Sequence, residues 1–295
     1  MVMKYFLPSP ALREFVRLLQ IMHLTFDQNV IVPPKAYWPR PEQCLAFNPR
    51  QPEIETKMAN GKYFAKSPVM LIGQPSMLTT RVVPHDFLLF QVVFQPGALF
   101  RLLGIPSQEL TDVHVNAESV FPKEIGLVNE RLRNTTDYGE MTKIVENFIH
   151  YLINRRKCSL SKSNLLPIDK VAYQMINANP ARYPQQNISL DKMASDACLS
   201  QKQFYRNFIE RMGISPKTYT RIVRFDNAMK LQNAQPHKDW LSIALHSGYY
   251  DYQHLVKDFK DFTKTTPADF VTKDNNAPER VLGVKEDFGG LALSA

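Results

Sequence analysis

In the second half of the chain, apolar and polar positions follow the period of an α-helix. Apolar residues recur three and four positions apart between Ile168 and Ile176, so that they share one face of a helix. The strand-like patterns of the first half do not recur after this point. The pattern predicts an all-α C-terminal domain.

The first half shows strand patterns followed by helix patterns. Val69 to Phe94 is rich in β-branched and aromatic residues, with apolar positions alternating on either side of a turn at Pro84–Asp86. Helical spacing follows over residues 98–103, 124–132 and 138–154. We expect an α+β fold here, a β-roll or sandwich-like domain followed by helices.

A polar segment separates the two halves. Residues 155–164 read RRKCSLSKSN, a basic, serine-rich stretch without an apolar period, which is typical of a solvated linker. The last residues contain Pro278, paired glycines and no period, which is typical of a frayed end. The predicted organisation is a first domain (1–155), a linker (156–166), a helical domain (167–273) and a flexible tail (274–295).

The helical domain contains a repeat. Residues 190–197 align with residues 240–247 at an offset of 50, and residues 201–216 align with residues 252–267 at an offset of 51. Each copy has a small residue, Ala194 or Ala244, where two helices cross, and a turn follows at Cys198 or Gly248. Ser200 with Gln203 forms a capping box. The repeat predicts two helix-turn-helix units.

The second helix of each predicted unit has an apolar and a polar face. Phe204 and Phe208 stand four residues apart in the first copy, and Leu255 and Phe259 do so in the second. These pairs must face the core, which leaves eight side chains pointing outward: Gln201, Lys202, Tyr205, Arg206, Tyr252, Gln253, Val256 and Lys257. Arginine, lysine and glutamine bind base edges or phosphates, and valine contacts a thymine methyl group, so these positions suit a DNA major groove.

One long helix is expected to join the two units. Residues 216–232 contain no glycine and no internal proline, and Tyr219, Ile222, Phe225 and Met229 lie on one side. At 1.5 Å per residue the helix would be roughly 25 Å long. It would therefore hold the two outward helices at the spacing of successive major grooves.

Composition agrees with a DNA partner and indicates the compartment. A formal charge of +8 and a pI near 9.3 permit a polyanionic partner. Cys44, Cys158 and Cys198 form no C-x-x-C pair, which argues against a disulfide framework or a cysteine zinc site. No apolar run approaches the roughly 20 residues that cross a bilayer, and the first 20 residues lack a signal-peptide core. The sequence predicts a cytoplasmic protein without a membrane partner.

These features together resemble a known family. The segments ISLDKMASDACLSQKQFYRNFIERMGISPKTY and IALHSGYYDYQHLVKDFKDFTKTTPADF are similar to the DNA-binding domain of the AraC/XylS family of bacterial transcription regulators. The resemblance covers about residues 168–272, and it implies that residues 201–212 and 251–262 are the DNA-reading helices. The eight outward residues are then the DNA contacts, and double-stranded DNA is the partner.

The resemblance has one local departure and is weaker upstream. Lys264 stands where the family has glycine, which predicts a longer or strained end for the second reading helix. Tyr252 and Val256 offer few polar contacts, so the second unit is expected to read weakly or to bind mainly the DNA backbone. The N-terminal half resembles family sensing domains only over residues 94–112.

The remaining residues do not indicate another chemistry. His23, His85 and His114 are far apart without metal-ligand spacing, and His246 and His254 lack a serine or cysteine elbow. We therefore expect no metal, no cofactor and no enzymatic activity. Cys198 and Trp240 are interpreted as packing residues.

Two functional hypotheses follow. In the first, the chain is a sequence-specific transcription regulator, an activator that responds to a small-molecule effector through its N-terminal domain. In the alternative, it is a ligand-independent regulator whose N-terminal domain forms a homodimer or contacts RNA polymerase. A thermal-shift screen separates them, because a ligand that binds the folded state raises its stability.

Overall fold

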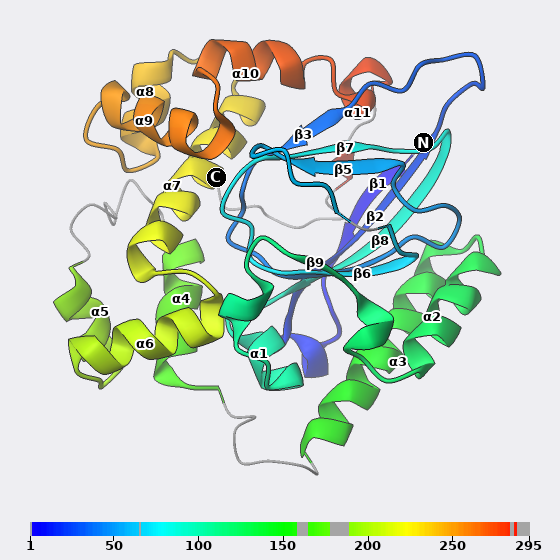
Figure 1. Ribbon diagram of the computed structural model, residues 1–295, viewed down its shortest axis with the longest axis horizontal. Helices are drawn as coiled ribbons and strands as arrows, with labels where there is room; N and C mark the ends of the chain where they lie inside the picture. Colours follow the sequence, from blue (N-terminus) through cyan, green and yellow to red (C-terminus); the bar gives the residue numbers. More distant parts are fainter. Residues whose placement is uncertain (1, 65, 158–164, 178–188, 284–285, 288–295) are drawn as a thin grey trace.

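The computed structural model describes residues 2–64, 66–157, 165–177, 189–283 and 286–287, and for residues 156–157 and 286–287 it describes only the backbone. Two β-sheets and three α-helices form the N-terminal part, and the C-terminal part is helical (Figure 1). The predicted α+β fold is confirmed.

The larger sheet contains seven of the described strands. In sheet order they are β10 (Glu286–Asp287), β1 (Val2–Phe6), β2 (Val16–Thr25), β8 (Asp86–Phe94), β4 (Cys44–Phe47), β6 (Val69–Ile72) and β9 (His114–Asn116). Neighbouring strands are antiparallel except β1 and β10, which are parallel. The smaller antiparallel sheet consists of β3 (Lys35–Tyr37), β7 (Thr79–Val82) and β5 (Glu55–Met58). The predicted turn at Pro84–Asp86 therefore connects two sheets rather than two paired strands.

Strand β8 lies at the centre of the N-terminal core. Leu88, Phe90 and Val92 belong to the cluster beneath the helices, whereas Leu89 and Val93 belong to a second cluster on the opposite face. That face is turned toward the smaller sheet (Figure 1). Because both faces are covered, the strand is apolar along nearly its whole length and not only at alternate positions.

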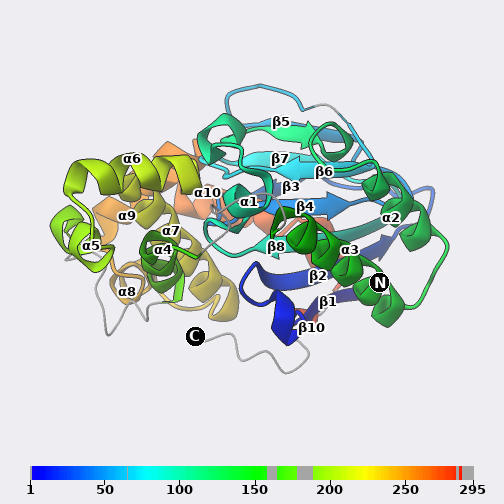
Figure 2. The same ribbon diagram turned by 90° about the horizontal axis from the view of Figure 1, so that it is seen from below.

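Three helices cover the outer face of the larger sheet (Figure 2). They are α1 (Ala98–Leu103), α2 (Glu124–Arg133) and α3 (Tyr138–Lys157), with short 3₁₀ turns η1 (Pro10–Leu12), η2 (Ser107–Leu110) and η3 (Ala117–Ser119) between elements. Helix α1 has the predicted bounds and is flanked by Gly97 and Gly104, both with positive φ. Helix α3 extends to residue 157, past the predicted start of the linker at residue 156, and residues 158–164 lie outside the described part.

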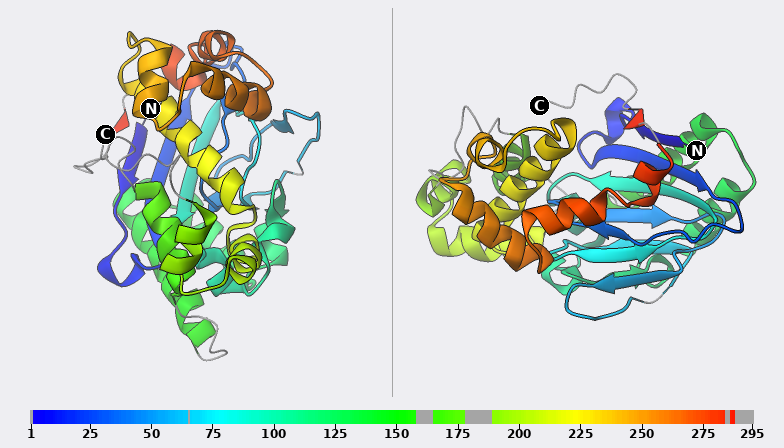
Figure 3. Two further views of the ribbon diagram at one scale, coloured as in Figure 1. Left: turned by 90° about the vertical axis from the view of Figure 1, so that its left-hand side faces the viewer. Right: turned by 90° about the horizontal axis from the view of Figure 1, so that it is seen from above.

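The C-terminal part contains the expected helices. They are α4 (Pro167–Asn177), α5 (Leu190–Asp196), α6 (Gln201–Met212), α7 (Pro216–Ala234), α8 (Trp240–His246), α9 (Tyr252–Thr263), α10 (Pro267–Asp274) and α11 (Pro278–Val281). Helices α4–α6 and α8–α10 lie at opposite ends of α7, to one side of the β-sheets (Figures 1 and 3). None of the described helices is both long and apolar enough to span a lipid bilayer.

The described residues 275–283 are folded, unlike the flexible tail predicted for residues 274–295, whereas residues 284–285 and 288–295 lie outside the described part. Ala277 is buried, Arg280 pairs with Asp274 at 2.6 Å, and Glu279 forms an ion pair with Lys35 of β3. Residues 286–287 then pair with β1. The sequence lacks a period here because the segment is held by individual ion pairs and backbone bonds rather than by an apolar stripe.

Candidate nucleic-acid interface

The two repeated helix pairs, α5–α6 and α8–α9, have the same local geometry. Each second helix begins at a side-chain cap: the hydroxyl of Ser200 accepts from the amide of Gln203, and the carboxylate of Asp251 accepts from the amide of His254. In return, the amide of Ser200 donates to the side-chain oxygen of Gln203 at 3.2 Å, which completes the predicted capping box. The predicted duplication is therefore present at the level of individual hydrogen bonds.

The turns within the two units are also equivalent. The amide of Leu199 donates to the carbonyl of Ala194 at 2.9 Å, and the amide of Tyr249 donates to that of Ala244 at 3.0 Å. Each bond requires a positive φ at the preceding residue, which is +85° for Gly248 and +55° for Cys198. The side chain of Cys198 is exposed, so its interpretation as a packing residue was wrong. Cys198 occupies a glycine-like backbone position and points outward.

Aromatic packing fixes the second helix of each unit. Phe204 and Phe208 are fully buried, and Phe208 meets Tyr219 of α7 edge-on with ring centroids 5.4 Å apart. In the second unit, Phe259 packs edge-on against Phe225 of α7 at 4.8 Å. Partly buried Trp240 also meets Phe259 at 5.4 Å, as expected for a packing residue. Helix α7 thus supplies one aromatic side chain to each outward-facing helix, Tyr219 to α6 and Phe225 to α9.

The predicted DNA contacts lie on the open sides of α6 and α9. Six of the eight side chains are exposed, four on α6 and two on α9: Gln201, Lys202, Tyr205, Arg206, Gln253 and Lys257. Tyr252 and Val256 are half-buried, and Tyr252 packs against the core of the C-terminal part. The amide of Gln201 also donates to Asp191 of α5. The structure therefore leaves cations of both helices accessible and gives Tyr252 a second, packing role.

A buried carboxylate connects α7 to α9. Asp258 accepts from the guanidinium of Arg221 at 2.9 and 2.6 Å and from the hydroxyl of Tyr249 at 3.0 Å. Arg221 also pairs with Asp261 at the outer side. Since charge-assisted bonds of this kind are directional, the network sets the angle between the connecting helix and the second outward helix.

A second buried ion pair fixes the end of α6. Arg211 binds Asp169 of α4 through two bonds of 2.6 and 2.5 Å, and both residues are almost fully buried. The guanidinium also lies over the ring of Phe100 in α1, 4.9 Å from its centroid. The neighbouring backbone is held too, because the hydroxyl of Ser107 donates to the carbonyl of Arg211 at 2.8 Å. The first unit is therefore joined directly to the N-terminal part.

The second unit contacts the N-terminal part at a different place. The amide of Leu78 donates to the carbonyl of Phe262 at 2.8 Å, and Trp38 meets Phe270 edge-on at 6.2 Å. The indole N–H of Trp38 donates to Asp226 of α7 at 2.9 Å. Burial alone would raise the pKa of Asp226, but Lys230, Arg40 and the hydrogen bonds from Lys230 and Trp38 outweigh burial and lower the pKa. Asp226 thus remains charged and strengthens the bond to Trp38.

Lys264 ends α9 in the manner of a glycine. The helix stops at Thr263, and Lys264 adopts φ +60°, as Gly213 does with φ +91° after α6. The helix is therefore not longer than in the first unit, and the strain predicted from the sequence is found at a single residue. The ammonium group of Lys264 donates to the carbonyl of Asp261 at 3.0 Å.

We expect Lys264→Gly to stabilise the protein. Glycine adopts a positive φ without steric cost, so the free energy of unfolding should rise by up to about 1 kcal/mol despite the greater freedom of glycine in the unfolded chain. Urea denaturation measures the change. Lys260→Gly, at an exposed position inside the same helix, should instead destabilise by about 1 kcal/mol. A destabilised Lys264→Gly variant would show that the backbone there is unstrained.

Sequence patterns did not identify the buried polar residues that fix the two helix-turn-helix units to their neighbouring elements. Three of these residues form hydrogen bonds with partners that lie between 9 and 188 residues away along the chain: Asp258, Asp169 and Trp38. Buried polar residues inside otherwise apolar helix faces were the available signal, since they need buried partners. Among the described residues, no group of three or more histidine, cysteine, aspartate or glutamate side chains is placed to hold a metal ion.

Two capped helix pairs with exposed polar second helices define a helix-turn-helix protein. Residues 193–273 match the family model described as "Helix-turn-helix domain", and residues 4–116 match a "Domain of unknown function (DUF6597)". The C-terminal region is an AraC-type helix-turn-helix domain, which confirms the resemblance seen in the sequence. The matched relatives are transcriptional regulators by name and not enzymes.

Two relatives show the extent of the similarity. The chain is 25% identical over 169 residues to the probable transcriptional regulator LumQ of Photobacterium leiognathi, covering 55% of this chain and 66% of the relative. It is 31% identical over 87 residues to an uncharacterized HTH-type transcriptional regulator of Haemophilus influenzae, covering 30% and 29%. The chain thus spans less than two thirds of the length of either relative.

Solved structures of ToxT from Vibrio cholerae are similar in overall arrangement. One from strain O395 is 11% identical, covers 88% of this chain and 98% of ToxT, and has a TM-score of 0.45. Another, of unsaturated fatty acid bound ToxT, is 11% identical with a TM-score of 0.45 and covers 86% and 94%.

Proposed function

We propose that the protein is a sequence-specific DNA-binding transcription regulator that acts in the cytoplasm. The observation that carries this proposal is the pair of exposed polar helices, α6 and α9, each fixed to α7 by buried aromatic packing. At 19 residues, α7 is about 28 Å long, which suits two helices that enter successive major grooves. The two matched relatives are named as regulators of this kind.

The exposed side chains have separate roles in this proposal. Arg206 and Lys202 of α6 reach base edges and phosphates, with Gln201 and Tyr205 beside them. Gln253 and Lys257 do so from α9, and Val256 contacts a thymine methyl group. Half-buried Tyr252 supports the start of α9 more than it reads bases. The second unit therefore contributes fewer base-specific contacts than the first.

The N-terminal part regulates the DNA-binding domain in our proposal. It contacts the first unit through Ser107 and Phe100 and the second through Leu78 and Trp38, so a change in its conformation moves both units. We propose that a small-molecule effector makes this change and that the protein is an activator. The alternative is a ligand-independent regulator whose N-terminal domain forms a homodimer or contacts RNA polymerase.

Enrichment of genomic DNA fragments on the full chain at physiological salt tests DNA recognition. We expect a small set of fragments that share one sequence element, because nonspecific phosphate contacts weaken steeply with salt and base contacts do not. The matched control is a variant with Lys202, Arg206 and Lys257 all changed to alanine. Equal enrichment by the control, or fragments without a shared element, would contradict the proposal.

A thermal-shift screen on the same protein separates the effector hypothesis from its alternative. A metabolite at 100 times its Kd should raise the stability by about 2.7 kcal/mol. A screen without any stabilising metabolite, together with a dimer mass in solution or retention of polymerase, would favour the alternative.

A further inference from the structure

Three lysines form a row along α9 and its C-terminal end. Lys257, Lys260 and Lys264 are spaced three and four residues apart, which places them on one side of the helix, and all three are exposed. At 1.5 Å per residue this lysine row is about 10 Å long, close to the roughly 12 Å width of the major groove. A helix that enters the groove with its first turn therefore brings the later lysines of the row to the rim of the groove.

The acidic residues of α9 do not neutralise the lysine row. Asp258 and Asp261 both pair with Arg221, and Asp251 accepts from the amide of His254. Within the described parts of the chain, no lysine of the row forms an ion pair. Like charges at this spacing repel one another, so the row does not stabilise the fold.

The backbone also disfavours the last lysine of the row. Lys264 has φ +60°, a conformation that glycine adopts freely and other residues adopt with strain. Its ammonium group has three N–H donors, and among the described residues it forms one hydrogen bond, to the carbonyl of Asp261 at 3.0 Å. Strained residues of this kind concentrate at functional sites.

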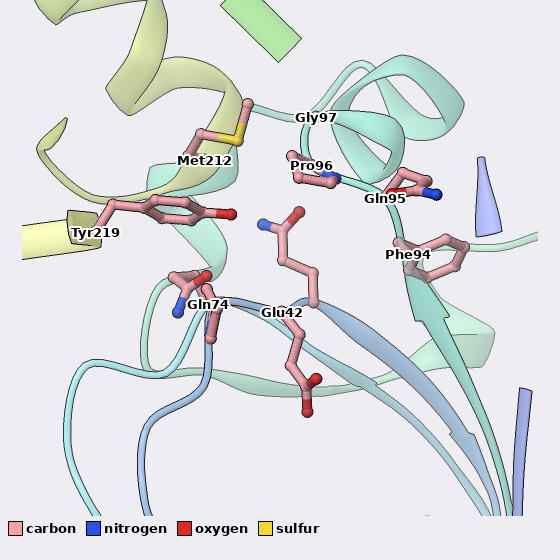
Figure 4. Close-up of a pocket in the computed structure, with 10 residues that line it drawn as sticks. Glu42, Gln74, Phe94, Gln95, Pro96, Gly97, Met212 and Tyr219 are labelled. Carbon is pink, nitrogen blue, oxygen red and sulfur yellow. The ribbon is translucent and has the colours of Figure 1, made fainter. Parts of the chain in front are cut away.

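The end of the other outward helix, α6, is covered by the N-terminal part. Met212 lies beside Tyr219 of α7 and close to Gly97 of the N-terminal part (Figure 4). A Cβ atom added to Gly213 would lie 2.7 Å from the Oγ1 atom of Thr111. A side chain therefore does not fit at this end of α6.

The two copies thus use equivalent positions differently. Ile209 and Gly213 of the first copy correspond to Lys260 and Lys264 of the second at the offset of 51. Gly213 is buried, whereas Lys264 is exposed. The end of α6 serves the contact with the N-terminal part, and the end of α9 is open to a charged partner.

We propose that Lys260 and Lys264 bind phosphate groups of the DNA strand at the rim of the major groove, next to the contact made by Lys257. Ammonium groups bind phosphates of any sequence, so the second unit anchors the protein on the duplex while the first supplies most of the base recognition. Bound phosphates offset the repulsion within the lysine row and the strain at Lys264. This inference rests on the proposed function and names further residues of the same interface.

Fluorescence anisotropy of the full chain with a labelled DNA duplex of random sequence tests the proposal, because phosphate contacts do not depend on sequence. Lys260→Gln and Lys264→Gln should each lower the slope of log affinity against log salt by about one, and the double variant by about two. Between about 50 and about 200 mM salt, a slope lower by one makes the loss of affinity about fourfold smaller. Natural slopes in both single variants would overturn the proposal. A natural chain that does not bind the duplex would instead overturn the proposed function, and this inference with it.

Two further variants separate phosphate binding from net charge and from folding. Lys143→Gln, at an exposed position on α3, makes the same change in charge and should keep the natural slope. Lys264→Gly should lower the slope by about one although it is expected to be more stable in urea, so its weaker binding cannot result from unfolding. An equal effect of Lys143→Gln, or a natural slope for Lys264→Gly, would also contradict the proposal.

Discussion

Replacing Asp169 with alanine is expected to lower the free energy of unfolding by about 3 to 5 kcal/mol. The change leaves the guanidinium of Arg211 without its two bonds of 2.6 and 2.5 Å in a position that is 3% exposed. A buried charge without a partner is far more costly than the pair itself is stabilising. Chemical denaturation of the full chain measures the loss.

Two comparisons separate this effect from ordinary loss of contacts. The double variant Asp169→Ala with Arg211→Met removes both charges and should recover much of the lost stability. Asp196→Ala removes one partner of an exposed pair, Lys192–Asp196, and should cost less than about 0.5 kcal/mol. A loss below about 1 kcal/mol for Asp169→Ala alone would show that water reaches Arg211.

Arg206→Ala is expected to weaken binding to the specific DNA site by about 1 to 3 kcal/mol, or roughly 5- to 150-fold. The reason is that an arginine exposed on the outer side of α6 can bind a base edge through two bonds. Lys257→Ala should instead weaken binding to all sequences and lower the slope of log affinity against log salt by about one. Fluorescence anisotropy over a range of salt concentrations distinguishes the two outcomes.

Lys143→Ala is the matched control for these variants. Lys143 is exposed on α3, away from both helix-turn-helix units, and its replacement makes the same change in net charge. If the combined Arg206→Ala and Lys257→Ala variant bound DNA like this control, the assignment of α6 and α9 as reading helices would be wrong.

The helical region was predictable because its signals are local. Apolar spacing placed α7, and the pair Ser200 and Gln203 placed the start of α6, since a cap bonds within three residues. The offset between the copies, which changes from 50 to 51, corresponds to one additional residue, Tyr250, before the cap of α9. The second turn is longer by that residue, and its side chain is 75% exposed.

The N-terminal architecture was only partly predictable because strand pairing is not local. The pattern indicated strands near β7 and β8 but not that they belong to different sheets. Strand β2 pairs with β8 across about seventy residues, from Val16 with Phe94 to Thr25 with Asp86, and its own ten residues lack a simple alternation because both faces are covered. Register of this kind depends on the partner strand rather than on the strand itself.

The candidate interface was predicted as a set of positions and not as a geometry. Arg206 and Lys257 could be recognised from helical faces, because a helix position determines its direction. The exposure of Cys198 could not be predicted, because it depends on the conformation of the turn. Cys198 has a positive φ there, and the next residue, Leu199, bonds back to Ala194. The half-buried position of Tyr252 likewise depends on packing against neighbouring helices.

The tandem duplication has a consequence for the symmetry of a DNA target site. Dimeric helix-turn-helix proteins have a two-fold axis and therefore favour palindromes. Here the copies follow one another along a single polypeptide and differ in their outward residues, with Arg206 in the first copy and Val256 and Lys257 in the second. A monomer bound through both copies would favour a non-palindromic DNA sequence with two different halves. Reversing that sequence relative to a transcription start point would reverse the orientation of the bound protein.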